Sequence, residues 1–406
     1  MNKQLLVLLI GRIITNFADS FYMVATVWYV KTVTNSPFLI GLTSAVVILP
    51  VTLQFIYGPI IDRYSKRKIL YFAMIGQAII VSVISMLYFT HLLWLPLLLL
   101  MMFLSFLFSE ITFPTESSLI EVLCPREKLT KVNSIFEFCY QSLDTICNGI
   151  SGILVLFIGV GFIYVSSSCL LFFVGLIFLV YLKVPKTKKE SEVTTIGFLK
   201  QYKVDFIQGF QVVKEQNILL SIVFGVIGLN VMATMGIAML PVISNTSAQY
   251  GFWLTAMSIG TLLGALLANK VEKVPLNLVM PISSLFAGVF WIFSTLLVNK
   301  IIFATILFGI AWIGIGIISI YVQTLIQVNL PEEYLGLGFA FISSILGSLS
   351  PIGYFIGGLI GGLTSGKVIL FISGLGYLGF AVYFLLNPKL NGLKNQLNKR
   401  FEHSNE

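Results

Sequence analysis

Twelve long apolar runs, separated by short connectors, constrain the fold of this 406-residue sequence more than any other feature. A helix needs about 20 mostly apolar residues to cross the hydrocarbon layer of a membrane. The runs are continuously apolar rather than alternating, which favours helices over membrane strands. The predicted spans are 5–30, 38–61, 69–90, 93–123, 132–158, 160–183, 217–243, 249–269, 275–298, 301–328, 334–361 and 367–387.

The composition also points to a chain that is surrounded by lipid. Hydrophobic residues make up 57% of the sequence and charged residues only 10%, whereas soluble domains contain roughly 45–50% apolar residues. So few charges cannot cover the surface of a soluble protein of this length, and we expect an all-α integral membrane protein. The net charge of +8 does not indicate nucleic-acid binding, because the cations lie in connectors and near the two ends.

Lysine and arginine predict the orientation of the spans. With the N-terminus inside, 22 of the 25 cationic residues fall on the inner side, and the exceptions are Lys31, Lys300 and Lys367. Because cytoplasmic connectors are enriched in Lys and Arg, we expect both termini in the cytoplasm. The chain is then a multi-pass protein of the cell membrane. Its excess of Lys over Arg, 20 to 5, favours a bacterial source.

The spans divide into two six-helix halves. Residues 1–183 form the first, 184–216 a cytoplasmic linker, 217–387 the second and 388–406 a cytoplasmic tail. Residues 117–129 align without gaps with 323–335 at an offset of 206, and the same offset brings Gly58 onto Gly264. Parallel repeats related by an axis along the membrane normal are typical of transporters. We therefore expect two pseudo-symmetric halves.

Acidic residues inside the predicted spans occur only in the first half. A charge at mid-bilayer costs about 2.5–3.5 kcal/mol on insertion scales, so such residues usually face a cavity or a partner. Neither histidine lies in a span, so carboxylates are the candidates for proton transfer. The candidates are Asp19, Glu110, Glu116, Glu137 and Asp144.

On the first span, Arg12, Asn16 and Asp19 recur at helical spacing and share one face. Two hypotheses fit this face. In the first, Asp19 contacts substrate or carries a proton, taking it up when the site closes and releasing it when water enters. In the second, Asp19 makes a helix-to-helix hydrogen bond or an ion pair with Arg12.

Spans four and five carry the other candidates. Glu137, Gln141 and Asp144 follow one another at steps of four and three residues, so they form a polar stripe that suits water or another helix better than lipid. Glu110 and Glu116 are six residues apart and cannot point the same way. We expect one of them to face a cavity and the other to pack within its half.

The second half would line the ligand cavity with uncharged, flexible side chains that suit a large amphipathic ligand. Its candidates are Asn230, Met235, Gln323 and Gln327. Flexible Met side chains adapt to varied ligands and favour broad recognition. The alternative is that these side chains only pack against helices or lipid.

Known catalytic and metal-binding patterns are absent from the sequence. It contains no GxxxxGK[ST], HExxH or GxSxG, so we expect no enzyme, no catalytic residue and no cofactor. The four cysteines have no metal-site spacing, so neither a metal nor a disulfide is predicted. The first apolar run continues to Val30 without a small-residue cleavage site and is interpreted as a retained span.

The connector GPIIDRYSKRKIL (58–70) resembles the signature G-x-x-x-D-R-x-G-[RK]-[RK] between spans 2 and 3 of the major facilitator superfamily. Ser65 stands where the family has Gly. The resemblance implies that this cluster acts as a latch, holding one transporter state by contacting the other half. The matching positions are Gly58, Asp62, Arg63, Lys66 and Arg67.

Two further segments narrow the resemblance. Residues 16–42 (NFADSFYMVATVWYV to TNSPFLIGL) and 113–134 (FPTESSLIEVLCPREKLTKVNS) resemble a branch containing macrolide-efflux proteins and enterobactin-type siderophore exporters. The resemblance implies a monomeric secondary exporter in the bilayer that exchanges protons for an amphipathic drug-like molecule, with antibiotic resistance as a consequence. The alternatives are export of a siderophore or another secreted metabolite, and a non-transporting scaffold or sensor.

Overall fold

The computed structural model describes residues 3–57, 60–61, 64–125, 128–184, 207–208, 210–214, 216–271, 274–330 and 335–391. Within these ranges the regular secondary structure is entirely helical. Backbone groups inside lipid need internal hydrogen bonds, which a helix supplies within one segment. The prediction of an all-helical membrane fold is therefore confirmed.

The chain forms two compact units. The N-terminal unit comprises Met1–Asn35, Thr43–Leu199 and Ser244–Leu254, and the C-terminal unit comprises Ser36–Leu42, Lys200–Ile243 and Thr255–Glu406. Each unit thus contains one short segment from the other half of the sequence, which the sequence-based boundaries do not include.

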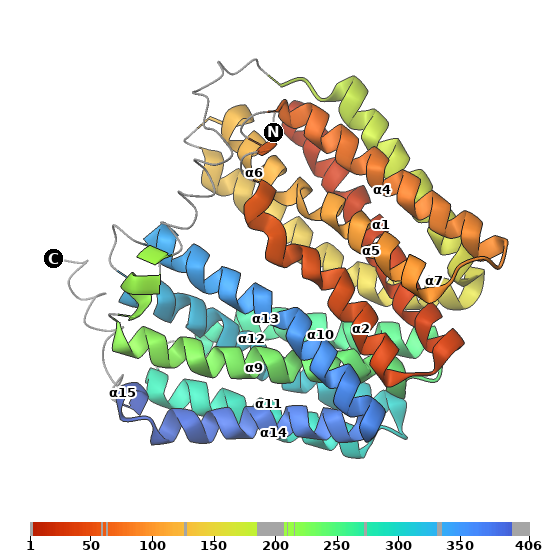
Figure 1. Ribbon diagram of the computed structural model, residues 1–406. Helices are drawn as coiled ribbons and strands as arrows, with labels where there is room; N and C mark the ends of the chain where they lie inside the picture. Colours follow the sequence, from red (N-terminus) through yellow and green to blue (C-terminus); the bar gives the residue numbers. More distant parts are fainter. Residues whose placement is uncertain are drawn as a thin grey trace. The chain divides into compact units, whose positions relative to one another are not determined.

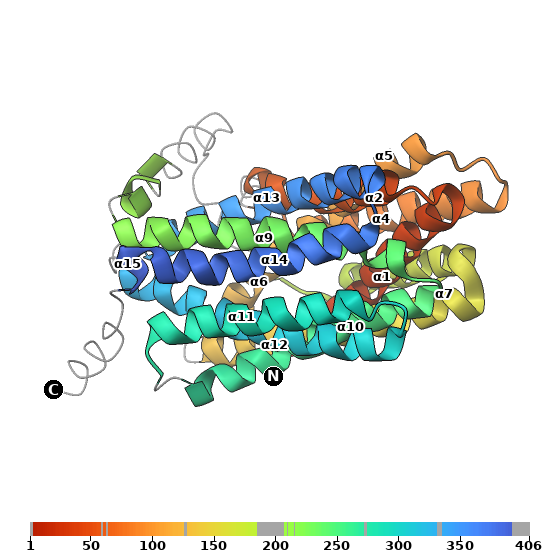
Figure 2. The same cartoon turned by 90° about the horizontal axis from the view of Figure 1, so that it is seen from below.

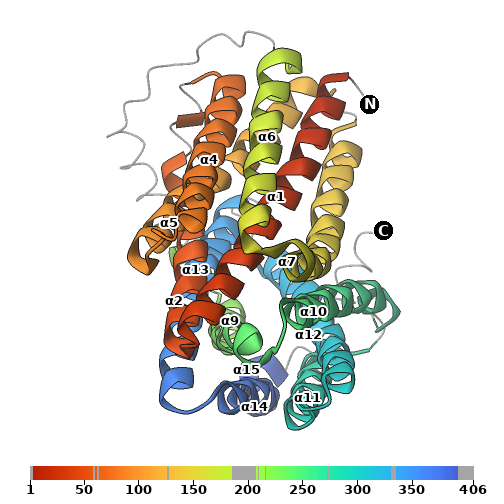
Figure 3. The same ribbon diagram turned by 90° about the vertical axis from the view of Figure 1, so that its right-hand side faces the viewer.

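The helices of the N-terminal unit are built on the apolar runs of the first half. Their bounds are α1 Lys3–Thr34, α2 Pro37–Ile48, η1 Leu49–Ile56, α4 Lys66–Phe89, α5 Leu95–Glu110, α6 Thr112–Leu123 and α7 Leu129–Tyr181. Residues 37–42 of α2 belong to the C-terminal unit. Within the unit, α7 packs against both α1 and α4, and α4 also packs against α5 (Figure 3).

The C-terminal unit has a matching series of helices. Their bounds are α9 Asn217–Ile243, α10 Ser247–Ala268, η3 Asn269–Val271, α11 Leu276–Leu296, α12 Ile301–Asn329, α13 Leu335–Leu363, α14 Gly366–Leu386 and α15 Pro388–Asn391. Residues 247–254 of α10 belong to the N-terminal unit. Helix α9 packs against α13 and α14. Figure 1 shows α9 with α13, and Figure 2 shows it beside α14. Helix α11 packs against α12 and α14, and its run beside α12 is visible in Figure 2.

Ten helices of the described part are long and apolar enough to cross a membrane. The predicted span 38–61 falls on α2 and η1, whose apolar portion, Pro37–Leu53, is shorter. The predicted spans 132–158 and 160–183 are joined in the 53 residues of α7, which breaks at Gly159. In Figure 3 the chain turns back within the yellow part of this element.

Two close helix contacts involve glycines that are related by the offset found in the sequence. A Cβ on Gly152 of α7 would lie 2.7 Å from the Cα of Gly251 on α10, inside the N-terminal unit. A Cβ on Gly358 of α13 would lie 2.8 Å from the Cα of Gly41 on α2, inside the C-terminal unit. Gly152 and Gly358 are 206 residues apart, so each unit uses the same repeat position for backbone-to-backbone packing.

Candidate functional site

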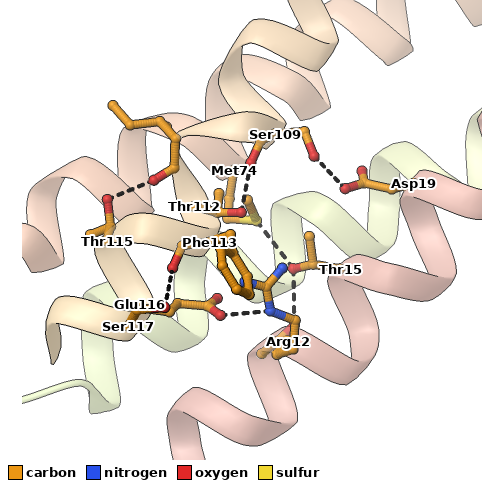
Figure 4. Close-up of polar contacts among 12 residues, drawn as sticks. Arg12, Thr15, Asp19, Met74, Ser109, Thr112, Phe113, Thr115, Glu116 and Ser117 are labelled. Atoms are coloured by element: carbon orange, nitrogen blue, oxygen red, sulfur yellow. Dashed lines mark hydrogen bonds and ion pairs between the residues drawn. The ribbon is translucent and has the colours of Figure 1, made fainter. Parts of the chain in front are cut away.

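A buried ion pair joins α1 to α6 in the N-terminal unit. The Nε atom of Arg12 lies 2.6 Å from Oε2 of Glu116, and the two residues are only 6% and 3% exposed. The guanidinium carbon of Arg12 also lies 5.3 Å from the ring centre of Phe113, as Figure 4 shows. The pair neutralises both charges where hydration cannot, so it packs as a neutral unit.

Asp19 lies two turns further along α1 and has different partners. Its Oδ2 accepts a hydrogen bond of 2.6 Å from the hydroxyl of Ser109 at the end of α5, which is drawn in Figure 4. Its Oδ1 accepts a hydrogen bond of 2.7 Å from Nε2 of Gln77 on α4. Asp19 is half-buried. Both of these donors are neutral groups, in contrast to the cation that holds Glu116.

The hydrogen bonds continue from Gln77 to Tyr22. Nε2 of Gln77 lies 2.9 Å from the Tyr22 hydroxyl, and the Ser105 hydroxyl lies 3.2 Å from the same oxygen. Two polar atoms beside this chain, Oε1 of Gln77 and Nδ2 of Asn16, are buried without a hydrogen-bond partner among the described residues. An unsatisfied buried polar group is costly, so each needs a physical reason.

The remaining predicted acids differ in what the structure shows. Glu110 is half-buried at the last position of α5 and lies close enough to Asp19 and Tyr57 to interact with both electrostatically. The other acids and the amide of the predicted stripe lie on α7, but their side chains fall outside the described part: Glu137, Gln141 and Asp144.

Two of the cations that match the family signature, Lys66 and Arg67, are described and lie at the first turn of α4. Nζ of Lys66 donates to the hydroxyl of Ser118 on α6. Nε of Arg67 donates to the Phe178 carbonyl at 3.3 Å, and its Nη2 donates to the Leu179 carbonyl. A cation is unfavourable at a helix N-terminus but favourable at a C-terminus. By capping the last turn of α7, Arg67 therefore gains a favourable interaction that offsets the unfavourable one between its charge and the N-terminus of α4.

The other three signature residues, Gly58, Asp62 and Arg63, lie outside the described residues. The predicted latch between the two halves is therefore not visible for them. The contacts of Lys66 and Arg67 that the structure shows lie within the N-terminal unit.

The predicted cavity residues of the second half lie on different helices of the C-terminal unit. Oδ1 of Asn230 on α9 accepts a hydrogen bond of 3.0 Å from Ser350 on α13. Met235 is buried on α9, Gln323 is exposed on α12, and the side chain of Gln327 is outside the described part.

Sequence reasoning missed Gln77 and Ser109, the two donors to Asp19. A signal for Gln77 was present, because it is the only amide in the apolar run 69–90. Ser109 carried none, since Ser in an apolar helix commonly bonds to a backbone carbonyl of its own helix. Its role depends on how α5 packs against α1.

Comparisons with known proteins agree with this architecture. Residues 8–353 match the sequence profile of the Major Facilitator Superfamily. No significant match was found among curated proteins.

Solved structures share the fold at low sequence identity. A bacterial homolog of the human lysosomal transporter Spinster, inward-facing and unoccupied, has 15% identity and a TM-score of 0.66 over 95% of this chain and 98% of that one. The nucleoside transporter NupG has 12% identity and a TM-score of 0.70 over 95% and 100%. A bacterial homologue of the iron transporter ferroportin, inward-facing, has 16% identity and a TM-score of 0.70 over 94% and 97%. The profile match spans most of the chain, and the protein therefore belongs to the Major Facilitator Superfamily, as a multi-pass membrane carrier rather than an enzyme.

Proposed function

We propose that this protein is a secondary active exporter that exchanges protons for an amphipathic small molecule by alternating access. The observation that carries the proposal is that two charged residues of α1 have different kinds of partner on other helices. Arg12 is committed to Glu116 at 2.6 Å, while Asp19 is held by the neutral donors Gln77 and Ser109. A carboxylate among neutral donors changes its protonation more readily than one locked to a buried cation.

The fold is compatible with proton coupling. A D-xylose-proton symporter has a TM-score of 0.66 to this chain over 96% of this chain and 98% of that one, at 13% identity. That likeness concerns the fold alone. Proton exchange in this chain is inferred from Asp19, with Glu110, Asp144 and Glu137 as further acids of the same half.

Export of a drug- or macrolide-type compound is supported by the resemblance of segments 16–42 and 113–134 to that branch. In the siderophore alternative, an anionic cargo would bind to Arg12. The pairing of Arg12 with Glu116 uses that positive charge and makes Arg12 a weaker anion site. We assign Arg12 and Glu116 a structural role and keep Asn16 and Gln141 as candidate cargo contacts.

In the proposed arrangement the chain is a monomer in the bacterial cell membrane with both termini in the cytoplasm. The signature residues Gly58, Asp62 and Arg63 latch one state, assisted by Lys66 and Arg67. We further propose that the cargo contacts the acids of the first half and uncharged, adaptable side chains of the second half, namely Asn230, Met235, Gln323 and Gln327.

Proteoliposomes with an imposed pH gradient test this function. We expect a labelled macrolide to accumulate in vesicles that are acidic inside, and adding the unlabelled macrolide to release protons that a pH-sensitive dye in the lumen detects. Asp19→Asn should abolish both signals, because the amide neither binds nor releases a proton, while its yield in the membrane stays at the wild-type level.

Three results would contradict parts of the proposal. Accumulation of a labelled catecholate siderophore instead of the macrolide would replace the cargo. Unchanged accumulation after the gradient is collapsed would remove proton coupling. Full activity of Asp19→Asn would remove Asp19 from the mechanism.

A further inference from the structure

Gln77 is a buried amide with an unusual set of contacts. It is fully buried on α4, and its Nε2 atom lies within hydrogen-bond distance of Oδ1 of Asp19 and the hydroxyl of Tyr22. Its Oε1 atom is buried and has no hydrogen-bond partner among the described residues. The amide therefore presents both N–H groups to the Asp19 cluster and leaves its acceptor unsatisfied.

The acceptor oxygen Oδ1 of Asp19 explains this orientation. An ionised carboxylate accepts hydrogen bonds and donates none. If the amide turned over, Oε1 would face Oδ1 of Asp19, and two acceptors would meet without a proton between them. The unsatisfied Oε1 is thus the cost of donating to Oδ1 of Asp19, and this hydrogen bond is stronger when the carboxyl group is ionised.

Ser109 differs from Gln77 in one chemical respect. A hydroxyl both donates and accepts, and its hydrogen rotates to suit its partner. Ser109 can therefore donate to Oδ2 of an ionised Asp19 and accept from the O–H of a protonated one, over the same 2.6 Å contact.

We propose that Gln77 is a positioning residue that favours the ionised form of Asp19, and that Ser109 holds the carboxyl group in both forms. This inference rests on the proposed function, in which Asp19 carries the proton. Gln77 then promotes release of the proton, and Ser109 keeps the carboxyl group in place during the change.

Other groups around Asp19 act on its charge as well. Arg12 and Tyr22 lie on its own helix, and Glu110 lies on α5. Glu116 on α6 is paired with Arg12. Tyr164 on α7 is bonded at 2.8 Å to Thr26, which lies seven residues further along α1 than Asp19. The test therefore changes Gln77 alone and leaves these groups in place.

The experiment measures the pH dependence of macrolide-induced proton release for Gln77→Met in proteoliposomes. Met has a similar length but no donor. We expect half-maximal release to move toward alkaline pH by about one unit, because a hydrogen bond to a charged group is lost. A purely structural role would lower the rate by the same factor at every pH. Ser85→Ala, on the same helix, is the matched control and should keep the wild-type profile.

A second variant and a direct readout keep the inference testable if Gln77→Met inserts poorly. Gln77→Glu has nearly the shape of the native side chain and places a second acid beside Asp19, so it should shift the profile in the same direction. Infrared difference spectroscopy of the protonated carboxyl C=O stretch, identified by its loss in Asp19→Asn, follows the titration of Asp19 without transport.

The two proposals fail in different ways. If Asp19→Asn abolishes coupling but Gln77→Met and Gln77→Glu titrate like the wild type, Gln77 does not tune Asp19 and the inference is wrong. If Asp19→Asn still exchanges protons, the proposed function itself is wrong.

Discussion

At the scale of single residues, hydrogen bonding separates acids that the sequence presents as equals. Glu116 is held by a cation and Asp19 by two neutral donors, although both lie in the same unit. A buried ion pair is costly to break because the remaining charge has no compensation. These two carboxylates should therefore respond differently to substitution: Asp19 in coupling and Glu116 in stability.

The Arg12–Glu116 pair should behave as one energetic unit. Arg12→Met and Glu116→Met each remove one member of the buried ion pair and leave the charge of the other, and we expect each to lower the free energy of unfolding by about 3–5 kcal/mol. The double variant removes both charges and should recover most of that loss. Thermal unfolding in detergent, followed by intrinsic fluorescence, completes the double-mutant cycle. Simple addition of the two losses would show that the pair is not coupled.

At the scale of elements, α7 depends on one backbone position. Gly159 has φ 79° and ψ 162° inside an element of 53 residues. That region of backbone space is essentially restricted to glycine. It lets one continuous stretch of apolar sequence supply two helical segments, as the sequence predicted with separate spans ending at 158 and beginning at 160.

Gly159→Ala should destabilise the protein through the backbone alone. Among the described residues, no atom outside the local backbone lies within 4 Å of a Cβ built at this position, so no clash with their side chains contributes. We expect a loss of about 1–3 kcal/mol in the free energy of unfolding, measured by thermal unfolding in detergent. Gly228→Ala is the matched control, because a Cβ there also meets no atom of the described part beyond the local backbone within 4 Å, but the φ of Gly228 is not positive. Equal stability of Gly159→Ala and Gly228→Ala would contradict the strain argument.

At the scale of the whole molecule, the duplication is reflected in helix packing, whereas the charge distribution predicts the orientation of the connectors in the membrane. The repeat offset of 206 residues reappears in the close contacts of Gly152 and Gly358. Large apolar side chains such as Phe72 and Phe157 are exposed on the helix surfaces, as lipid contact requires. Which side of the membrane each connector faces is predicted by Lys and Arg alone.

Cysteine labelling tests that orientation. In a variant without the four native cysteines, Lys300→Cys should react with a membrane-impermeant maleimide in intact cells. Lys270→Cys should react only after the cells are permeabilised, because its connector is predicted to be cytoplasmic. The opposite pattern would invert the topology, and labelling of both positions in intact cells would contradict the predicted span between them.

The fold was predictable to a large extent because its main signal is local. The length and hydropathy of each apolar run predict that it crosses the membrane as a helix, and this prediction does not depend on how neighbouring helices pack. The signature connector added the family, which the profile match over residues 8–353 confirms. The exceptions are local as well: α2 is short, and Gly159 divides α7.

The candidate site was predictable only in part. Arg12, Asp19 and Glu116 could be selected from sequence because charges inside apolar helices are costly and rare. Their pairing could not be predicted, since Arg12 and Glu116 are 104 residues apart in the sequence. Asp19, on the same helix as Arg12, was an equally good candidate for the ion pair.

The sequence by itself determined that this chain is a helical membrane carrier of the Major Facilitator Superfamily. Hydropathy and the signature both depend on residues that are adjacent in the sequence. Only the tertiary structure decided that Glu116 neutralises Arg12 and that Gln77 and Ser109 hold Asp19. The physical reason is that hydrogen bonds form over about 3 Å, and which side chains come that close depends on how α1, α4, α5 and α6 pack against one another.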